Sequence, residues 1–399
     1  MEGWVFMRIN WFSNAPWAPT GYGNQTKLFA PRIRDLGHQM SITAFYGLNG
    51  GVLQWNGIPT YPGGNHMYGQ DVMYANANHF SSDLIIALLD AWVLNMAGSK
   101  TAQIPLAAWY PVDSEPIPAP VERQAQQADY RIVFSRHAEQ QTNMAGLDCY
   151  YVPHGVDTEA FKPTPLAEAR ERIFTDRVDP DAFLVGMVAA NKGTPSRKAL
   201  PENLQAFAQF HRKHPDSVLY LHTHKAEAGE NGGVNLPEII QYLGLRPGTD
   251  VVFVDQYAYH LGLPDEYMAL MYSSLDVLLM ATMGEGFGIP TVEAQACGCP
   301  VIVGDWTASG ELCFSGWKIP KEQAAGWWTP LAAYQYMPMV DGIVEALEKA
   351  YQAKGKKHIR QDARTGAMEY DADSITKRYW KPVLEDIEKR ISDGRKDAA

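Results

Sequence analysis

The feature that most constrains the fold is an alternation of short apolar runs with helix-like segments, which occurs twice along the chain. In the first part, the apolar runs are short and rich in strand-forming residues, and segments with helical spacing separate them. Alternation of this kind is typical of a parallel sheet with helices on its faces. The strand candidates of this part are residues 5–9, 40–45, 83–89, 105–110 and 131–134.

The same pattern starts again after a connection at residues 162–182 that contains proline, aspartate and arginine. With 399 residues, the chain is long enough for two cores, because single cores seldom grow past roughly 250 residues. The pattern therefore predicts two successive open α/β units, followed by a helix over 372–391 that is capped near Asp373 or Ser374 and bent at Pro382. The strand candidates of the second unit are residues 183–190, 217–223, 250–254, 276–282 and 300–305.

Composition narrows the class of protein. The chain is 46% hydrophobic and 20% charged, which is usual for a globular protein, and its formal charge of −11 argues against a broad electrostatic grip on nucleic acid or anionic lipid. It contains no apolar run of membrane-spanning length, and its start, MEGWVFMRIN, lacks the features of a secretion signal, so we expect a cytoplasmic location. Cys297 and Cys299 have no second pair of ligands at zinc spacing, so we expect them to serve in packing.

The stretch MGEGFGIPTVEAQACGCPV, residues 283–301, carries the clearest chemistry. It follows a strand candidate, and sheets of this class bind ligands outside the carboxyl ends of their strands. Gly286 and Gly288 allow close approach to the backbone, and the helix that starts near Pro290 offers amides and a favourable dipole to a phosphate. Glu285 precedes this helix and Glu293 lies about one turn inside it, so the two carboxylates could hold different hydroxyl-bearing parts of one extended ligand.

These residues resemble a known family. EGFGIPTVE is similar to the E-x7-E motif of retaining glycosyltransferases of the GT-B fold, family 4-like group. The flanking segments YMALMYSSLDVLLMAT and EAQACGCPVIVGDWTASGEL agree with that group, as does YVPHGVDTEAFKP at the junction of the two units. Together the matching segments cover most of the C-terminal half and the junction.

The resemblance implies a GT-B architecture, with two facing Rossmann-like domains, a cleft between them and a C-terminal helix that crosses back to the first domain. It assigns residues 1–165 to an acceptor-binding domain, 166–375 to a nucleotide-sugar-binding domain and 376–399 to the returning helix. The implied reaction moves a sugar from a nucleotide diphosphate sugar, such as a UDP- or GDP-sugar, to an acceptor hydroxyl with retention. No metal or other cofactor is expected.

The resemblance also implies roles for single residues. Glu285 would hold hydroxyls of the transferred sugar, and Glu293 the ribose of the donor. The Gly286 turn and the amides of Phe287, Gly288 and Ile289 would meet the sugar and the phosphates.

A second candidate element is VAANKGTPSRKALPENLQAF, which begins at Val188. Arg197 and Lys198 lie between a strand and a helix, where cations can neutralise a departing diphosphate. In the family, an arginine precedes this lysine by some residues. Here Asn191 or Lys192 stands at that place, so Asn191 becomes a candidate donor ligand and the second phosphate ligand is unassigned.

Three further candidates follow strands. Gly21 and Gly23, in NAPWAPTGYGNQT, form a glycine turn before a helix predicted to start at Asn24, near the diphosphate by the resemblance. Asp113, in WYPVDSEPIP, could orient the acceptor hydroxyl or accept its proton, and Glu115 is the alternative. Tyr257 follows a strand of the second unit and could stack on the nucleobase.

Other functions remain open at this stage. A nucleotide-sugar epimerase or a phosphorylase could use the same architecture, although no motif for a pyridoxal-phosphate lysine is present, and a non-catalytic sugar-nucleotide or glycan binding protein is the alternative from another class. A Rossmann dehydrogenase is poorly supported, because no G-x-G-x-x-G follows the first strand. The acceptor is not fixed: a glycan, a protein or a small molecule would fit, and nucleic acid is not favoured.

Overall fold

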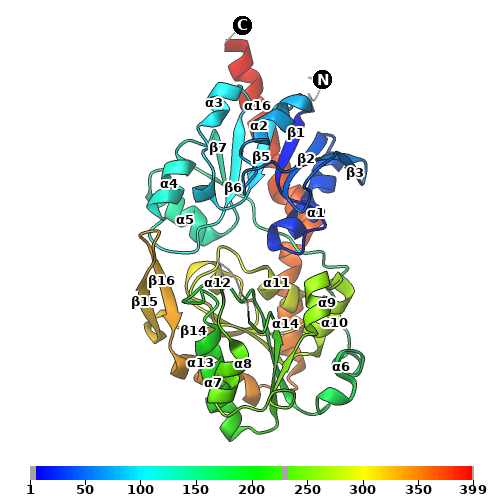
Figure 1. The fold of residues 1–399 in the computed structure, drawn as a ribbon, viewed down its shortest axis with the longest axis vertical. Coiled ribbons are helices and arrows are strands. Elements are labelled where there is room, and N and C mark those ends of the chain that lie inside the picture. Colours follow the sequence, from blue (N-terminus) through cyan, green and yellow to red (C-terminus); the bar gives the residue numbers. More distant parts are fainter. Residues whose placement is uncertain (1–5, 227–231, 398–399) are drawn as a thin grey trace. The chain divides into compact units, whose positions relative to one another are not determined.

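The computed structural model describes residues 6–226 and 232–397, and this part of the chain forms two compact units (Figure 1). The first unit holds the described residues up to Gly155, a short piece at Pro330–Ala333 and the chain from Tyr370 onward. The second unit holds Val156–Thr329 and Tyr334–Glu369. Each unit is built on its own sheet, as the repeated strand and helix pattern predicts.

The sheet of the first unit has the strand order β3-β4-β2-β1-β5-β6-β7-β8 over the described residues. All neighbours are parallel except β3 and β4, and the central strand β1 places Trp11 beside Ile42 of β2 and Ile86 of β5. The strands are β1 (Arg8–Asn14), β2 (Gln39–Tyr46), β3 (Leu53–Trp55), β4 (Ile58–Pro62), β5 (Leu84–Leu88), β6 (Leu106–Tyr110), β7 (Tyr130–Val133) and β8 (Tyr150–Tyr151).

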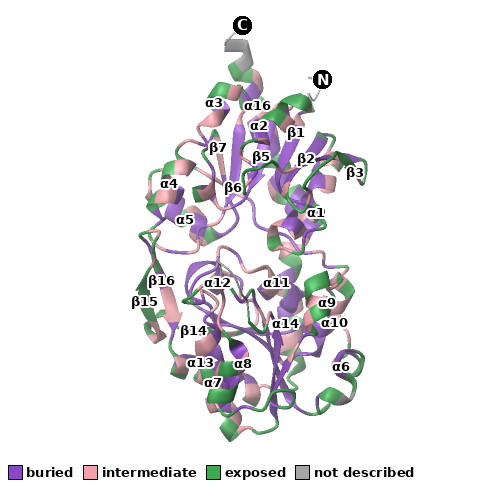
Figure 2. Ribbon diagram, viewed as in Figure 1, coloured by how far each residue is buried: buried purple, intermediate pink, exposed green. Residues whose placement is uncertain are grey.

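Helices and short helical turns connect these strands and cover the sheet, whose central strands are buried (Figure 2). The central strands β5 and β6 are almost wholly apolar, because both faces of a parallel sheet are covered. The connecting elements are α1 (Gly21–Asp35), α2 (Met73–His79), η1 (Ala91–Val93), α3 (Gly98–Ala102), α4 (Ala119–Ala125) and α5 (Arg136–Met144).

The sheet of the second unit has the order β11-β10-β9-β12-β13-β14 and is parallel throughout its described strands. A separate antiparallel hairpin, β15 with β16, follows the edge strand β14. The strands are β9 (Phe183–Val188), β10 (Ser217–His222), β11 (Val251–Phe253), β12 (Val277–Met280), β13 (Val301–Gly304), β14 (Gly316–Ile319), β15 (Ala324–Trp328) and β16 (Tyr334–Pro338).

A core of apolar side chains from these strands and their helices fills the second unit, with Phe183, Phe207 and Leu279 among its fully buried members. The helices and turns of this unit are α6 (Leu166–Phe174), η2 (Thr175–Arg177), α7 (Leu200–Lys213), α8 (Leu236–Tyr242), α9 (Gln256–Leu261), α10 (Asp265–Ser274), α11 (Ile289–Ala296), α12 (Thr307–Glu311), η3 (Lys321–Gln323), α13 (Val340–Gln352), α14 (Lys357–Ala367) and η4 (Met368–Tyr370).

The start of α1 differs from the prediction. The helix begins at Gly21, not at Asn24, because the Thr20 side chain caps it and accepts a hydrogen bond from the Gly23 amide at 3.0 Å. Gly21 and Gly23 therefore belong to the first helical turn. A side chain at position 23 would come within 2.4 Å of the Ala18 carbonyl oxygen, so only glycine fits this turn.

The C-terminal segment packs on the first unit, as predicted for a returning helix, but its local structure differs from the expected single capped helix. Asp371, rather than Asp373 or Ser374, caps α15 (Ala372–Ile375). A π-helical turn, η5 (Thr376–Trp380), then leads into α16 (Lys381–Asp397) just before Pro382. A π-helical turn accommodates a proline that would otherwise clash with the preceding turn.

Trp380 anchors this segment in the core of the first unit. Its buried ring lies 5.8 Å from Trp11, 4.9 Å from Trp109 and 5.9 Å from Phe29, measured between ring centroids. The four rings meet at tilted or edge-on angles, the arrangement that aromatic side chains favour. The core of the first unit thus includes side chains from both ends of the sequence.

Across the described residues, we find no helix with both the length and the apolar character needed to cross a bilayer.

We expect Trp380→Ala to lower the free energy of unfolding by about 3–5 kcal/mol, because it removes a buried aromatic side chain and leaves a cavity among three rings. Urea denaturation followed by intrinsic fluorescence measures the change. Trp92→Ala is the matched control, since Trp92 is 45% exposed and its loss should cost less than about 1 kcal/mol. Equal destabilisation by the two substitutions would contradict the anchoring role.

Candidate active site

The predicted acidic loop joins β12 to α11 in the second unit. Glu285 is buried in this loop, and its amide donates a hydrogen bond of 3.0 Å to the Thr307 hydroxyl oxygen. Gly288 has φ of +104° and forms the N-terminal cap position of α11, a conformation that favours glycine. The loop is therefore held in one shape by its backbone as well as by its side chains.

The structure brings Glu285, Arg197 and Lys198 together, as the sequence predicts. The Lys198 Nζ atom lies 2.6 Å from Glu285 Oε1, and Arg197 Nη1 lies 3.2 Å from Glu285 Oε2. Arg197 also donates a hydrogen bond to the Gly284 carbonyl oxygen, and its own carbonyl oxygen accepts one from the Met283 amide at 2.8 Å. The loop before α7 and the loop before α11 are thus joined by charges and by main-chain bonds.

The cations decide the protonation state of Glu285. Burial would by itself raise the pKa of this carboxyl, but the charges of Lys198 and Arg197 outweigh the burial and lower the pKa from 4.5 to about 2. Glu285 is therefore ionised at neutral pH and accepts hydrogen bonds only. One carboxylate and two cations leave this three-residue cluster with a surplus of one positive charge, which suits a phosphate-bearing ligand.

The first residues of α11 lie next to this cluster. Gly286, Gly288 and Ile289 are half-buried, so they remain accessible to a ligand, whereas the Phe287 side chain is buried. A helix N-terminus carries partial positive charge and favours an anion. The backbone of this segment could therefore meet the sugar and phosphates as the resemblance implies.

Glu293 lies inside α11 and is buried, with one carboxylate oxygen accepting a hydrogen bond of 3.0 Å from the Tyr272 hydroxyl. Tyr272 belongs to α10 and is buried as well; burial and the neighbouring Glu293 charge raise its pKa far above the usual value, so it stays a donor. Tyr272 thereby fixes the orientation of the Glu293 carboxylate. Sequence reasoning missed this partner, because nothing in the spacing of 272 and 293 links the two positions.

Asn191 makes contacts within the protein that were not predicted. Its side-chain amide donates hydrogen bonds to the carbonyl oxygens of His224 and Val234, at 3.1 and 2.8 Å, and its oxygen accepts one from the Val234 amide at 2.9 Å. These bonds use both amide hydrogens of a buried side chain. Asn191 therefore joins its own loop to the segments around His224 and Val234, and its predicted contact with the donor stays a prediction.

Two residues with left-handed backbone conformation flank the charge cluster. Ala199 has φ of +47° directly after Lys198, and Thr307 has φ of +50° where its hydroxyl supports the Glu285 amide. A β-branched residue such as threonine rarely adopts this conformation, and strain of this kind gathers at functional sites. Sequence reasoning could not find either position, because neither residue type signals a positive φ.

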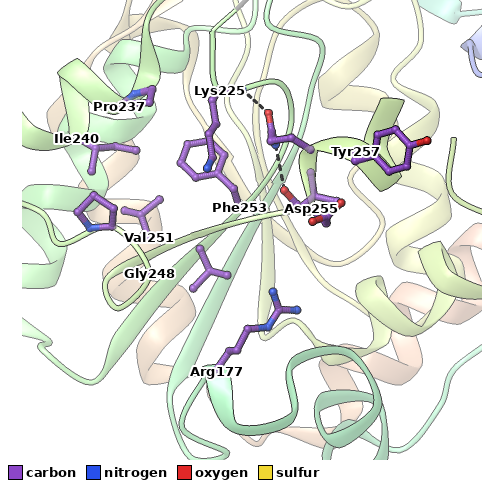
Figure 3. A pocket seen from close by; sticks show the side chains of 13 residues that line it. Arg177, Lys225, Pro237, Ile240, Gly248, Val251, Phe253, Asp255 and Tyr257 are labelled. Atoms are coloured by element: carbon purple, nitrogen blue, oxygen red, sulfur yellow. Dashed lines mark hydrogen bonds between the residues drawn. The ribbon is translucent and has the colours of Figure 1, made fainter. Parts of the chain in front are cut away.

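A cavity of about 560 Å³ lies along the edge strand β11 of the second unit (Figure 3). Apolar side chains of α8 and β11 line one part of it, and Arg177, Lys225 and Asp255 add charge. Tyr257, on α9, is exposed at one end, and in Figure 3 its ring points away from Ile240 and Val251. The predicted stacking residue is thus accessible at the rim of this cavity.

The side chain of Gln256 organises the rim near Tyr257. Its oxygen accepts a hydrogen bond of 2.9 Å from the Lys225 amide, and its nitrogen donates to the carbonyl oxygens of Thr223 and Val254 at 3.2 and 3.0 Å. Asp255 caps α9 by accepting a hydrogen bond of 2.8 Å from the Ala258 amide. The backbone that presents Tyr257 is thereby fixed on both sides.

The remaining candidates belong to the first unit. Gly21 and Gly23 lie in the capped first turn of α1, at the carboxyl end of β1. Asp113 is half-buried in the loop between β6 and α4, beside Ser114, whose carbonyl oxygen lies 3.0 Å from His137 Nε2. These positions follow the strands named in the prediction.

His222 and His224, which lie two residues apart at the end of β10, do not form a metal centre in the part of the chain that the structure describes. There, no group of three or more His, Cys, Asp and Glu side chains has the arrangement needed to hold an ion. His222 is buried against Tyr220, and burial lowers its pKa to about 4. His224 packs edge-on against Tyr259.

The low pKa of Glu285 predicts how stability depends on pH. Because the folded-state pKa is depressed, the ionised carboxylate contributes stability that is fully present above pH 4.5 and is lost as the pH falls towards about 2. Glu285→Gln should remove this contribution, so the stability difference between wild type and variant should narrow by about 2 kcal/mol between pH 6 and pH 3. Urea unfolding at the two pH values measures the difference, and an unchanged gap would contradict the assigned ion pairs.

Comparison with known proteins supports the family named by the sequence motifs. Residues 253–313, which include Glu285 and Glu293, match the family described as Glycosyl transferases group 1. Over 177 residues the chain is 29% identical to the GDP-mannose-dependent alpha-(1-6)-phosphatidylinositol monomannoside mannosyltransferase of Mycolicibacterium smegmatis, covering 42% of this chain and 41% of that protein. It is 31% identical over 153 residues to a D-inositol 3-phosphate glycosyltransferase of Segniliparus rotundus, covering 38% of this chain and 30% of that protein. The matches thus span less than half of each relative.

Solved structures resemble the chain over nearly its whole length. Sucrose-phosphate synthase from Thermosynechococcus elongatus superposes with a TM-score of 0.75 at 17% identity, covering 96% of this chain and 100% of that one. Anabaena HepE, solved in complex with UDP-glucose, gives a TM-score of 0.67 at 17% identity, covering 95% of this chain and 100% of that one. At these identities the likeness establishes the fold. The chain therefore has the predicted GT-B fold, and its residues 253–313 match the glycosyl transferases group 1 family, in agreement with the family that the motifs predict.

Proposed function

We propose that this protein is a retaining glycosyltransferase that moves a sugar from a UDP- or GDP-sugar to an acceptor hydroxyl without a bound metal. The observation that carries the proposal is the cluster that the buried Glu285 forms with Lys198 and Arg197 beside the first turn of α11. It combines a fixed carboxylate for sugar hydroxyls with two cations for a diphosphate.

Donor binding would redistribute the contacts of the two cations. In the described structure, Lys198 and Arg197 both face the Glu285 carboxylate. A diphosphate placed against the start of α11 would share these cations, while Glu285 would turn its accepting oxygens to sugar hydroxyls. Glu285 therefore holds the two cations beside the start of α11 before the donor arrives.

The reaction then follows from charge and geometry. The bond between the anomeric carbon and the phosphate oxygen breaks, and a bond from that carbon to the acceptor oxygen forms on the same face of the sugar. The acceptor proton passes to the departing phosphate, so no group on the protein must form a covalent intermediate. Lys198 and Arg197 stabilise the negative charge that grows on the leaving diphosphate, which is the largest task that remains for the protein.

The nucleoside part of the donor is assigned to the neighbouring elements. Glu293, oriented by Tyr272, would accept hydrogen bonds from the ribose hydroxyls, and Tyr257 would stack on the base at the rim of the β11 cavity. One relative named for GDP-mannose and one structure solved with UDP-glucose support a nucleotide sugar as the donor class. Asp113, or Glu115 beside it, remains our candidate for orienting the acceptor hydroxyl.

A screen of nucleotide sugars by thermal shift tests donor binding. A donor held at a hundred times its dissociation constant should stabilise the fold by about 2.7 kcal/mol. We expect UDP- or GDP-sugars to produce such a shift and Glu293→Ala to remove most of it, because the ribose contact is lost. Tyr272→Phe is the matched control: it keeps the carboxylate and should retain more of the shift than Glu293→Ala. Equal shifts in wild type and Glu293→Ala would contradict the ribose assignment.

Turnover tests the role of the cations. We expect Lys198→Met to lower kcat by about 10²–10³, because a charge that stabilises the leaving diphosphate is removed while the length of the side chain is kept. Lys349→Met, at an exposed position on α13, is the control and should leave kcat unchanged. The assay follows nucleotide diphosphate release, and nuclear magnetic resonance of the product reads its anomeric configuration.

The outcomes separate the alternatives. A glycosylated product with inverted configuration would contradict the retaining mechanism. Free sugar isomers without transfer would favour an epimerase, and donor binding without any turnover would favour a binding protein. If Lys198→Met leaves the kinetics unchanged, the assignment of the diphosphate to this cluster is contradicted.

A further inference from the structure

The hairpin of β15 and β16 presents an exposed aromatic pair. Trp328 and Tyr334 lie directly opposite each other in the antiparallel register, with ring centroids 4.8 Å apart and planes at 69°. The two residues are 55% and 44% exposed. Aromatic side chains that stay exposed contribute less to the stability of the fold than buried ones. The pair is therefore a candidate surface for binding a ligand.

The pleat of the hairpin fixes which way these rings face. Side chains of Tyr334 and Tyr336 share one face, because they are two residues apart on β16, and Trp328 joins them as the partner of Tyr334. Trp327, the preceding residue on β15, faces the other side and is 41% exposed. The ring of Tyr334 lies against Gly326, where an added Cβ atom would be 3.5 Å from Tyr334 Cδ1. The absence of a side chain at Gly326 leaves room for the ring on the surface of β15.

The base of the hairpin is attached to the loop that carries Glu285. The Tyr336 amide donates a hydrogen bond of 2.8 Å to the Met283 carbonyl oxygen, two residues before Glu285. The Tyr336 ring lies 6.3 Å from the ring of Trp306, whose indole N–H bonds the Thr282 carbonyl oxygen at 3.0 Å. Tyr336 is the residue bonded to the acidic loop, and Tyr334 precedes it by two residues on β16. Two residues along a strand span about 7 Å, which is close to the length of one sugar unit.

We propose that Trp328 and Tyr334 form a platform for a pyranose unit of a glycan acceptor, an inference that rests on the proposed glycosyltransferase function. A pyranose has an apolar C–H face that packs on an aromatic ring and hydroxyls around its edge that stay in water. The exposed ring pair offers such a surface next to the loop that would hold the transferred sugar. The acceptor class that fits is therefore an oligosaccharide or a glycan-bearing molecule, whose sugar preceding the acceptor residue rests on the hairpin.

The size and charge of the surface favour a glycan over a protein or a membrane. Two aromatic side chains that are about half exposed offer on the order of 150–250 Å² of contact area, far below the roughly 1,200–2,000 Å² that stable protein interfaces bury. The chain carries a formal charge of −11, which opposes binding to anionic lipid. A single sugar ring can pack its C–H face on one exposed ring, while the second ring, at 69° to the first, borders the edge of the sugar.

The test uses the full chain with maltotriose and α-1,6-mannotriose as probes, followed by isothermal calorimetry and ligand-observed nuclear magnetic resonance. We expect wild type to bind at least one of the two, and Trp328→Ala and Tyr334→Ala each to weaken binding by about tenfold. Trp327→Ala is the matched control, since it removes an exposed tryptophan from the opposite face of the same strand, and should change the affinity by less than about twofold. Trp328→Phe should restore part of the affinity.

The proposal is overturned if neither trisaccharide binds, if Trp327→Ala is as harmful as Trp328→Ala, or if Trp328 instead governs sedimentation with phosphatidylcholine vesicles. The thermal shift that nucleotide sugars produce in Trp328→Ala, measured in parallel, distinguishes failure of the glycan platform from failure of the proposed transferase function. A normal donor shift with no Trp328-dependent glycan binding rejects the platform alone. Trp328-dependent glycan binding without any donor shift supports the platform and rejects the transferase function.

Discussion

The neutralisation of one buried carboxylate governs the candidate site. Glu285 lies inside the protein, where an unpaired charge would be costly, and Lys198 and Arg197 must stay beside it. This requirement ties the loop before α7 to the loop before α11, because each supplies part of the same cluster. The geometry of the site is thus a consequence of electrostatics in the unliganded protein, and the surplus positive charge arises locally in a chain that is acidic as a whole.

Backbone strain surrounds this cluster on two sides. Ala199 and Thr307 both hold left-handed conformations, each at a cost of the order of 1–3 kcal/mol. Ala199 directly follows Lys198, and Thr307 supports the amide of Glu285, so the strained positions are those that aim the charged side chains. The strained backbone at Ala199 and Thr307 lowers the stability of the fold, and in return it helps to orient the charged side chains.

In the second unit, the strands and the position of the charged residues could be predicted from the sequence, because the apolar pattern and the chemistry of the loops indicate the same arrangement. The apolar runs became strands, and the three charged residues of the cluster met as predicted, because parallel strands bring their carboxyl ends to one edge. The bonds of the Asn191 amide to a segment more than thirty residues away could not be predicted, because spacing does not reveal such contacts. The Tyr272 partner of Glu293 escaped prediction for the same reason.

Other omissions had a visible signal. The hairpin of β3 and β4 turns at Asn56 and Gly57, which both have positive φ, and this dipeptide is a strong hairpin marker that the strand assignment passed over. The helix start at Gly21 could have been read from Thr20, a good capping residue. The hairpin of β15 and β16 was harder to find, because its tryptophans adjoin each other and hide the alternation of the strand.

The position of Trp380 has a consequence for how the protein is made. A ribosome releases most of the first unit before the second, yet the tryptophan that fills the aromatic core of the first unit follows the second unit in the sequence. Until then, Trp11, Trp109 and Phe29 lack their fourth neighbour. The nascent amino-terminal half must therefore wait, incompletely packed, while the whole second unit is synthesised, and a chain cut short before residue 380 would leave that half without its closing piece.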